Sequence, residues 1–335
     1  MSKALNLTVL ADAWTIPNDD PDFINEPEAC STEFDVIDTL RTLGHNVSVL
    51  SVPDDVPALA TELAENKPDI VFNLTEQLGG DRTMDKNIAA VLELMGIPFT
   101  GTGPAGLLLC RDKRLCKEML SLHKIRVPGF VSFPLNQKVR VPAKIHYPLV
   151  VKPALEDSSE GISNASLVTN EKALLERVQF VHDGWRQPVI AEEYIEGREL
   201  YVGIIGNTRL KVLPIRECHF KSDDADGPRL ATYRVKWNKK YREKWDIEFG
   251  YADLEPALFN RIERVCKKVY RVLRIRDYGR IDLRLTPDGK LVILEANPNP
   301  DIAYGEEVAE AAEKAGIKYE SFIQNLLQTA RRRYK

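Results

Sequence analysis

The chain has 335 residues, of which 44% are hydrophobic and 29% are charged. This composition is typical of a soluble globular protein of two or three domains, and it excludes collagen-like, disordered and membrane-spanning chains. With 46 lysines and arginines against 50 aspartates and glutamates, the net charge is −4, so the chain lacks the basic excess expected of a nucleic-acid-binding protein.

The start of the chain predicts a strand rather than a signal peptide, because Leu5, Leu7 and Val9 alternate with polar residues. No apolar run approaches the ~20 residues that a membrane helix needs. Five scattered cysteines without a Cys-x-x-Cys pair indicate neither a zinc site nor a disulfide framework. We therefore expect a cytoplasmic protein without nucleic acid or membrane partners.

Alternating strand and helix patterns over the first hundred residues predict a parallel α/β layer. Strands are expected over 5–10, 47–52 and 69–74. One helix should end at Leu43, before Gly44, and another should span 83–95, before Gly96. Glycine favours the left-handed conformation that follows a helix, so both glycines support these helix ends.

The pattern changes after residue 110. In chain order we expect a helix over 112–122, a strand over 147–152, a helix that opens at 169–171, a strand over 188–195, paired strands over 200–205 and 210–215, an amphipathic helix from Leu258 to Val272, a hairpin, and a final helix from about Glu306. The segment 216–251 is charged and aromatic without clear periodicity. We predict that it is a long functional loop.

The hairpin is the most informative segment. Two alternating strands flank Asp288-Gly289, which favours a two-residue type I′ turn. If Pro287 then faces Lys290, the same register sets Asp282 opposite Glu295 and Arg280 opposite Asn297. The other face becomes a core face, with these opposed pairs: Ile281 and Ala296, Leu283 and Leu294, Leu285 and Val292.

The opposed carboxylates predict a metal site. Side chains directly across a strand pair have Cβ atoms about 4.5 to 5.5 Å apart, so Asp282 and Glu295 should repel each other unless a cation lies between them. Together with Asn297 they offer only oxygen ligands, which suit Mg²⁺ or Mn²⁺ and not zinc. The alternative is a solvated, charged edge of the sheet. We favour the metal.

Two further segments suggest nucleotide binding. Lys152 ends an apolar strand and precedes a loop in which Ser158, Ser159 and Gly161 could present backbone amides to a phosphate, although the same pattern suits an ordinary solvent loop. The segment 191–195 could line an adenine, with Glu199 on the sugar hydroxyls. The plainer alternative is that its tyrosine packs into the core. The chain has no nucleophile elbow and no Cys-His pairing that would indicate covalent catalysis.

Taken together, these motifs resemble the ATP-grasp superfamily, and specifically its D-alanine–D-alanine ligases. The resemblance covers nearly the whole chain and rests on these residues in one order: Lys113, Lys152, Ser158, Ser159, Gly161, Glu192, Glu193, Tyr194, Ile195, Glu199, Arg280, Asp282, Glu295 and Asn297. It implies an α/β (α+β) ATP-grasp fold. A Rossmann-like domain over 1–108 would precede two α+β subdomains that sandwich ATP, over 109–197 and 198–335, with a lid loop at about 216–251.

The resemblance also implies a role for each matched residue. Lys113 and Lys152 would contact the α and β phosphates, and 158–161 would cover the γ phosphate. The remaining assignments are Glu192, Glu193, Tyr194 and Ile195 at the adenine, Glu199 at the ribose, Asp282, Glu295 and Asn297 at two Mg²⁺ ions, Lys236 in the lid, and Arg280, Lys236 and Ser158 in catalysis. Small amino acids or short peptides would be the substrates. A homodimer is a candidate because family members are commonly dimers.

Departures from the family pattern lie in the substrate pockets. Residues 10–17 lack the family's glycine pair and its Ser-x-Glu, whose glutamate helps to hold the amine of the first D-alanine. Trp237 stands where the family's loop has a tyrosine. Glu306 stands where the family has a serine that contacts the carboxylate of the second substrate. We expect Trp237, Asp301 and Glu306 to line altered pockets. The acceptor would not be D-alanine, and Glu306 with Glu307 would favour an amine-bearing or cationic group. Equally, these acids could simply complement a helix dipole.

Two other functions remain as alternatives. A nucleotide-binding regulator without turnover would be expected to have lost its metal ligands, whereas all of them are present. A ligase that modifies a protein tail would call for a basic rim. The terminal run 331–333 is the only candidate for such a rim, and a solvated helix end is the favoured interpretation of that run.

Overall fold

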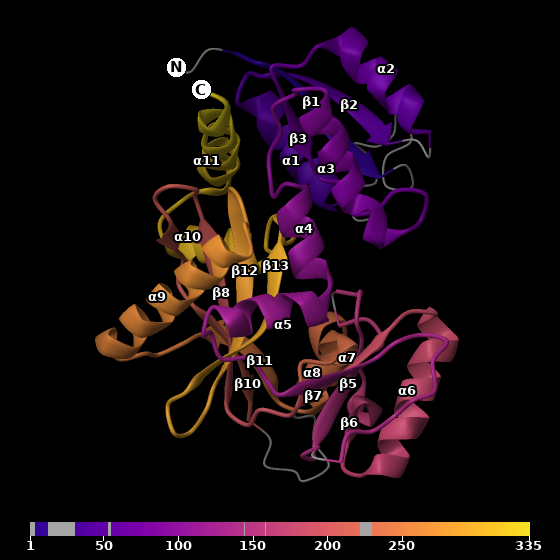
Figure 1. The fold of residues 1–335 in the computed structure, drawn as a ribbon. Coiled ribbons are helices and arrows are strands. Elements are labelled where there is room, and N and C mark those ends of the chain that lie inside the picture. The colour runs from indigo at the N-terminus through magenta and orange to yellow at the C-terminus, as the bar shows by residue number, and fades with distance from the viewer. Residues whose placement is uncertain (1–3, 13–30, 53–54, 144, 158, 222–229) are drawn as a thin grey trace.

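The computed structural model describes residues 4–12, 31–52, 55–143, 145–157, 159–221 and 230–335. These residues form a three-stranded, a six-stranded and a four-stranded sheet. The three-stranded sheet lies at one end of the molecule, and the other two lie side by side at the opposite end (Figure 1).

The first sheet is parallel, with strand order β2-β1-β3. Its strands and the helices around it are β1 (Asn6–Asp12), α1 (Ser31–Thr42), β2 (Asn46–Val52), α2 (Val56–Asn66), β3 (Ile70–Asn73), α3 (Asp85–Leu94) and α4 (Pro104–Arg111). This confirms the three predicted strands and the two predicted helices, and adds α2 and α4. The glycines after α1 and α3 have the expected positive φ, 83° at Gly44 and 68° at Gly96.

Alternation along β1 directs side chains into two cores. Leu7 and Val9 pack in a buried cluster with α1 and with two helices from the end of the chain, α10 (Glu307–Lys314) and α11 (Tyr319–Arg331). Leu10 packs on the other face with residues of α2 and α3. The predicted final helix is therefore two helices, separated at Gly316, and α11 lies beside the first sheet (Figure 1).

The six-stranded sheet has the order β11-β10-β8-β12-β13, with β9 paired to β8. The bounds of its strands are β8 (Arg198–Ile205), β9 (Lys211–Val212), β10 (Arg216–Phe220), β11 (Ile247–Tyr251), β12 (Tyr278–Leu285) and β13 (Leu291–Pro298). Two helices, α5 (Lys113–Leu122) and α9 (Pro256–Val272), share its main core cluster. The strand pair predicted around Gly206 is present, although β9 is much shorter than expected.

The segment 216–251 is not a loop. It contains β10 and β11, which pair with each other, and between them the short helices α7 (Tyr233–Trp237) and α8 (Lys239–Lys244). Residues 222–229 lie outside the described part. Both helices carry N-caps that the sequence displays: the Thr232 hydroxyl accepts from the Val235 N–H, and the Asn238 side chain accepts from the Tyr241 N–H. The strands escaped prediction because each has only five residues and no clean alternation.

The hairpin of β12 and β13 sets the predicted residues opposite one another. Asp282 pairs with Glu295, and Arg280 pairs with Asn297. The core face is also as predicted at Ile281, which is fully buried.

The path of this hairpin differs from the predicted one. The loop has three residues, 287–289, and Leu283 pairs with Ile293 rather than with Leu294. A β-bulge at Leu294 then adds one residue to β13 and restores the predicted register beyond it. The predicted two-residue turn was wrong, and the predicted carboxylate pairing was right because the longer loop and the bulge compensate for each other.

The third sheet has the order β4-β7-β5-β6 and packs against α6. Its bounds are β4 (Phe130–Phe133), β5 (Leu149–Pro153), β6 (Leu167–Val168), α6 (Glu171–Trp185) and β7 (Val189–Glu193). As predicted, α6 opens within 169–171: it begins at Glu171, and the side chain of its N-cap residue Asn170 accepts a hydrogen bond from the Ala173 N–H.

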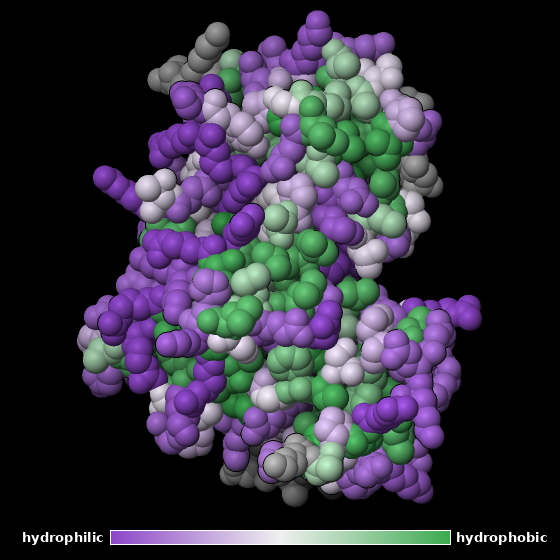
Figure 2. Space-filling view, in the orientation of Figure 1, coloured by the Kyte–Doolittle hydropathy of each residue, from purple (hydrophilic) through white to green (hydrophobic). Residues whose placement is uncertain are grey.

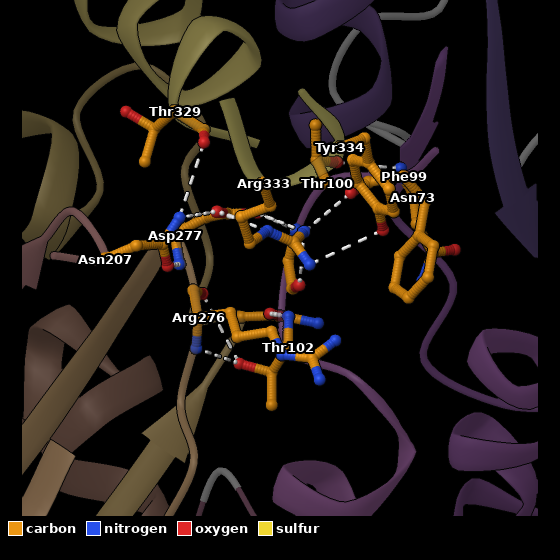
Figure 3. Close-up of polar contacts among 12 residues, drawn as sticks. Asn73, Phe99, Thr100, Thr102, Asn207, Arg276, Asp277, Thr329, Arg333 and Tyr334 are labelled. Carbon is orange, nitrogen blue, oxygen red and sulfur yellow. Dashed lines mark hydrogen bonds and ion pairs between the residues drawn. The ribbon is translucent and has the colours of Figure 1, made fainter. Parts of the chain in front are cut away.

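A buried ion pair joins the first sheet to the six-stranded sheet (Figure 3). Asp277 has no solvent exposure and lies 2.8 Å from Arg333, whose guanidinium also donates to the Phe99 carbonyl at 2.7 Å. Gly101 N–H and the Asn207 side chain donate to the same carboxylate at 2.8 and 2.7 Å. The C-terminal basic run is thus not simply a solvated helix end, because Arg333 is part of this junction.

On the surface, apolar side chains gather over α4 and α5 (Figure 2), the helices that carry the exposed Leu108 and Leu122. Across the described ranges, no helix is both long enough and apolar enough to cross a bilayer.

Candidate active site

The predicted nucleotide and metal residues meet between the six-stranded and four-stranded sheets. A small cavity of about 70 Å³ is lined by Lys152, Ser159, Glu192, Glu193, Tyr194, Ile195, Glu199, Lys236, Asp282 and Glu295. A larger cavity of about 750 Å³ lies toward the first sheet, with Lys113, Lys236, Arg280, Glu295 and Asn297 in its wall. Glu295 and Lys236 line both cavities.

Three buried lysines and two glutamates form the centre of the site. Glu192, 2% exposed, lies between Lys117 and Lys152, with ion-pair distances of 2.8 and 2.9 Å. Burial opposes ionisation of Glu192, but the two lysines hold its pKa below its usual range. Both carboxylate oxygens of Glu192 are thus engaged by lysines. The residue positions Lys152 and does not present a free carboxylate to a nucleotide base.

Lys113 and Glu295 form the second part of this centre, 2.7 Å apart. Lys113 is the first residue of α5, whose N-cap Asp112 accepts from the two following N–H groups. Although burial alone would raise the pKa of Glu295, the charges of Lys113 and Lys152 lower it to about 2. Glu295 is therefore ionised throughout the physiological range.

Lys117 was not among the predicted site residues. Its ammonium group donates at 2.8 Å to the carbonyl of Leu294, the bulge residue next to Glu295. Lys117 thereby connects α5 to both β7, through Glu192, and β13. One signal was available in the sequence: Lys117 follows Lys113 by four residues, so the two share one face of a helix.

Arg280, Asp282 and Asn297 lie together on the same face of the hairpin. Arg280 Nε and Nη2 contact the two Asp282 oxygens at 2.8 and 3.0 Å, and the Asn297 amide donates to Asp282 at 3.1 Å. Burial raises the pKa of Asp282, and Arg280 opposes that rise. Asp282, Glu295 and Asn297 therefore offer the predicted oxygen donors side by side, each held by protein partners.

These residues fit a hard divalent cation in ligand type. Within the described ranges, no group of three or more histidine, cysteine, aspartate or glutamate side chains could hold a metal. The candidate set is two carboxylates and one amide, which is the all-oxygen chemistry that Mg²⁺ prefers. An ion at this position would replace Lys113 on Glu295 and one of the donors on Asp282.

The wall of the small cavity is made of side chains that contact each other. Glu199 forms an ion pair with Arg284 and accepts from the Tyr201 hydroxyl at 2.8 Å, and the Arg284 guanidinium lies 5.9 Å from the Tyr194 ring centre. Both Glu199 oxygens are therefore engaged. Glu193 is exposed and accepts weakly from the Gly129 N–H at 3.4 Å.

The phosphate-loop prediction is only partly within the described ranges. Ser158 lies outside them. Ser159 adopts a left-handed conformation with φ 63° and donates to the Ala231 carbonyl at 3.0 Å. Gly161 is required as glycine, because its φ is +69° and a Cβ there would lie 2.7 Å from the Pro153 ring. The loop therefore touches the segment that precedes α7.

Helix α7 covers the site from the other side. Lys236 is close enough to oppose the rise in the pKa of Asp282 that burial causes, and to contribute to the lowered pKa values of Glu295 and Glu307. Arg242 of α8 donates to the Lys236 carbonyl at 2.6 Å and so fixes the end of α7. Trp237 ends α7, and its side chain lies outside the described part of the structure.

Glu76 lines the large cavity where it approaches the first sheet. It follows β3, and its N–H donates at 3.3 Å to Asp12, which ends β1 at the edge where ligands bind in parallel α/β sheets. Burial raises the pKa of Asp12 to about 6, and enclosure by the protein together with the Asp157 carboxylate raises that of Glu76 to about 7. Sequence reasoning missed both residues. Their position after parallel strands was the available signal.

The other wall of this cavity is formed by the start of α10. Glu307 lies 2.5 Å from Arg280 Nη1, and Glu310 forms an ion pair with Arg216. Glu306 is partly buried, and burial together with Asp301 raises its pKa. Asp301 is itself exposed and accepts from the Thr32 hydroxyl at 2.7 Å.

Residues 123–328 match the family model described as D-ala D-ala ligase C-terminus. The chain belongs to the D-alanine–D-alanine ligase family. It is 32% identical over 266 residues to the uncharacterized protein y4sG of Sinorhizobium fredii, covering 79% of this chain and 75% of that one. It is 30% identical over 277 residues to a D-alanine–D-alanine ligase of Desulfotalea psychrophila, covering 82% and 81%.

The fold agrees with this membership. A solved D-alanine–D-alanine ligase of Bacillus anthracis, complexed with ATP, superimposes with a TM-score of 0.75 over 99% of both chains, at 20% identity. The predicted D-alanine–D-alanine ligase-like ATP-grasp fold is confirmed. So is the predicted class of enzyme, an ATP-dependent ligase that forms carbon–nitrogen bonds.

Proposed function

We propose that this member of the D-alanine–D-alanine ligase family activates a small carboxylate with ATP and couples it to an amine at the site between the two sheets. The observation that carries the proposal is the pairing of the buried Lys113 with the hairpin carboxylate Glu295, at 2.7 Å, beside Lys117 and Lys152, which pair with Glu192. These groups supply the cations and the metal ligands that transfer of a phosphoryl group requires.

The nucleotide would lie in the small cavity. Lys113 and Lys152 would contact the α and β phosphates, the 158–161 loop the γ phosphate, and Tyr194 with Ile195 the base. Glu192 was predicted to contact the adenine and Glu199 the ribose. Instead, Glu192 would position Lys152, and Glu199 would position Arg284 and Tyr201. The cavity of about 70 Å³ is smaller than the ~300–1,000 Å³ of ligand sites, so α7 and α8 must move to admit a nucleotide.

Asp282, Glu295 and Asn297 would hold Mg²⁺, with Mn²⁺ as a substitute. The bound ions would neutralise charge on the β and γ phosphates. Arg280 and Lys236 would stabilise the oxygens on which negative charge develops, because Lys236 lines both cavities and Arg280 lines the large one beside Asp282.

The reaction would proceed in two steps. A carboxylate oxygen of the donor attacks the γ phosphorus, the bond from that phosphorus to the bridging oxygen breaks, and ADP leaves. The amine nitrogen of the acceptor then attacks the acyl carbon, the bond from that carbon to the phosphate oxygen breaks, and phosphate leaves while the nitrogen loses a proton. Positioning and exclusion of water in the enclosed cavity would contribute most of the acceleration.

An amino acid is the proposed class of donor. Glu76 lines the large cavity on the side of the first sheet, and Asp12 accepts a hydrogen bond from its N–H. An ammonium group on the donor would neutralise Glu76 while its carboxylate points toward Arg280 and the lysines.

Trapping with hydroxylamine tests this function without knowledge of the acceptor. The protein, Mg²⁺, ATP and a panel of amino acids should yield an amino-acid hydroxamate and one ADP for each hydroxamate. Asp282→Asn should lower the rate about 10²- to 10³-fold, whereas Asp288→Asn in the exposed hairpin loop should leave it unchanged. Absence of hydroxamate with every donor, or an unaffected Asp282→Asn variant, would refute the proposal.

A further inference from the structure

Two arginines of the large cavity, Arg280 and Arg216, contact protein carboxylates beside the start of α10. Arg280 contacts Asp282 through Nε and Nη2 and contacts Glu307 through Nη1, at 2.8, 3.0 and 2.5 Å. All three guanidinium nitrogens therefore have carboxylate partners. The neighbouring Arg216 is likewise paired, with Glu310.

Glu306 adds a carboxylate without a cationic partner. No lysine or arginine nitrogen among the described side chains lies within 4.0 Å of it, and it lines the cavity. Glu306 occupies the N-cap position of α10, but its side chain makes no capping hydrogen bond. A role in helix capping therefore does not account for it, and Glu307 points to Arg280 rather than to solvent.

The carboxylates at the start of α10, Glu306, Glu307 and Glu310, determine which charged groups can bind beside the acyl group. A carboxylate of the acceptor that approached Arg280 would have to displace Glu307 and would then face Glu306 and Glu310. Like charges that face each other repel, so this arrangement works against an amino acid as acceptor. An ammonium group meets complementary charge in the same place.

We propose that the acceptor is a primary amine without a carboxylate on its amine-bearing carbon, and that Glu307 excludes amino acids from this position. The inference rests on the proposed function, because it concerns the second substrate of that reaction. The amine enters as an ammonium ion and releases one proton to water or to Glu306. Its nitrogen then forms the bond to the acyl carbon, the bond from that carbon to the phosphate oxygen breaks, and the second proton of the nitrogen is taken up by the departing phosphate.

Matched acceptors test this specificity directly. Once hydroxylamine trapping has identified a donor, kcat/KM is measured for pairs that differ only by the carboxylate: 1,5-diaminopentane against lysine, and ethylamine against alanine of each hand. The amine of each pair should be preferred by at least about 10-fold. Equal or higher kcat/KM for the amino acids would overturn the inference. Hydroxylamine trapping needs no acceptor, so a preference for amino acids would overturn only the acceptor inference and leave the proposed function intact. Failed trapping would refute both the proposed function and the inference.

The variant Glu307→Gln tests the residue assignment. It frees one nitrogen of Arg280 and should shift the ratio of amine to amino acid kcat/KM at least about 10-fold toward the amino acid. Glu313→Gln, on the exposed side of the same helix, should leave the ratio unchanged. Hydroxamate formation by each variant reports that carboxylate activation is intact. An unchanged ratio in an active Glu307→Gln protein would refute the role of Glu307.

Discussion

The ammonium nitrogen of Lys117 lies 2.8 Å from the carbonyl oxygen of Leu294, the residue that forms the bulge in β13. The bulge interrupts the strand ladder, and Lys117 provides a hydrogen-bond donor to this carbonyl. The same nitrogen lies 2.8 Å from Glu192. One buried side chain thus connects Glu192 of the four-stranded sheet to β13 of the six-stranded sheet, the strand that carries Glu295.

Replacement of Lys117 by methionine should destabilise the protein and weaken ATP binding. It leaves the buried Glu192 with one cation and Leu294 without a donor, and breaking a buried pair typically costs about 3 to 5 kcal/mol. We expect an unfolding free energy lower by about 3 kcal/mol and a KM for ATP raised about 10-fold. Arg114→Met on the exposed face of α5 is the control. Equal urea midpoints for the two variants would contradict this role.

Lys236 should affect turnover more than nucleotide affinity. Its charge reaches Asp282, Glu295 and Glu307, beside which the proposed mechanism places the developing negative charge. Lys236→Met should lower kcat of the hydroxamate assay about 10²-fold, with KM for ATP changed less. Lys239→Met, exposed on α8, should behave like the parent protein. A change in KM alone would assign Lys236 to binding only.

Stability should depend on pH through Glu76. Although the Glu76 side chain keeps contact with solvent, which screens the effect, the protein around it and the Asp157 carboxylate raise its pKa from 4.5 to about 7 in the folded protein, so folding favours the protonated form. The stabilisation is therefore fully present below about pH 4.5 and is lost as the pH rises through 7. Arg82 opposes this rise, and Asp12 and Asp301 increase it.

Glu76→Gln removes this titration. Its melting temperature should equal that of the parent at pH 4 and exceed it at pH 8.5, because the parent then carries an unfavourable charge. Glu65→Gln, exposed on α2, should follow the parent at both pH values. A Glu76→Gln protein that melts below the parent at pH 8.5 would show that the ionised Glu76 is stabilised by contacts in the fold.

The Asp277–Arg333 pair should contribute strongly to stability. Arg333→Met leaves Asp277 buried without its guanidinium partner, and we expect a loss of about 3 to 5 kcal/mol in the unfolding free energy. The double variant with Asp277→Asn should recover part of it. Arg332→Met, the exposed neighbour, should cost less than about 0.5 kcal/mol. A loss that small for Arg333→Met would mean that solvent compensates for the missing contact.

The alternation of the hairpin was sufficient to predict which face carries Asp282 and Glu295. Alternation is a local property with a period of two residues, and the hydrophobic face specifies it. The three-residue loop and the bulge at Leu294 were not predictable, because each changes the pairing by one residue without changing the composition of either strand. Lys117 was missed because its role depends on that bulge.

The sequence patterns could not predict the roles of residues that depend on contacts between distant segments of the chain. Asp12 and Glu76 come together only because β1 and β3 are neighbours in a parallel sheet. Arg333 becomes structural because α11 returns to the first sheet. In the segment 216–251, strands of five residues gave too little periodicity for detection, although the caps Thr232 and Asn238 were visible.

The fate of the donor oxygen tests the central claim most directly. Amino acids labelled with ¹⁸O in both carboxylate oxygens are incubated with the protein, Mg²⁺, ATP and hydroxylamine, and the nucleotide and phosphate are analysed by mass spectrometry. We expect ADP and phosphate carrying one ¹⁸O atom, in equal amounts with the hydroxamate. Formation of AMP and pyrophosphate, or of ADP with unlabelled phosphate, would contradict an acyl phosphate intermediate at this site.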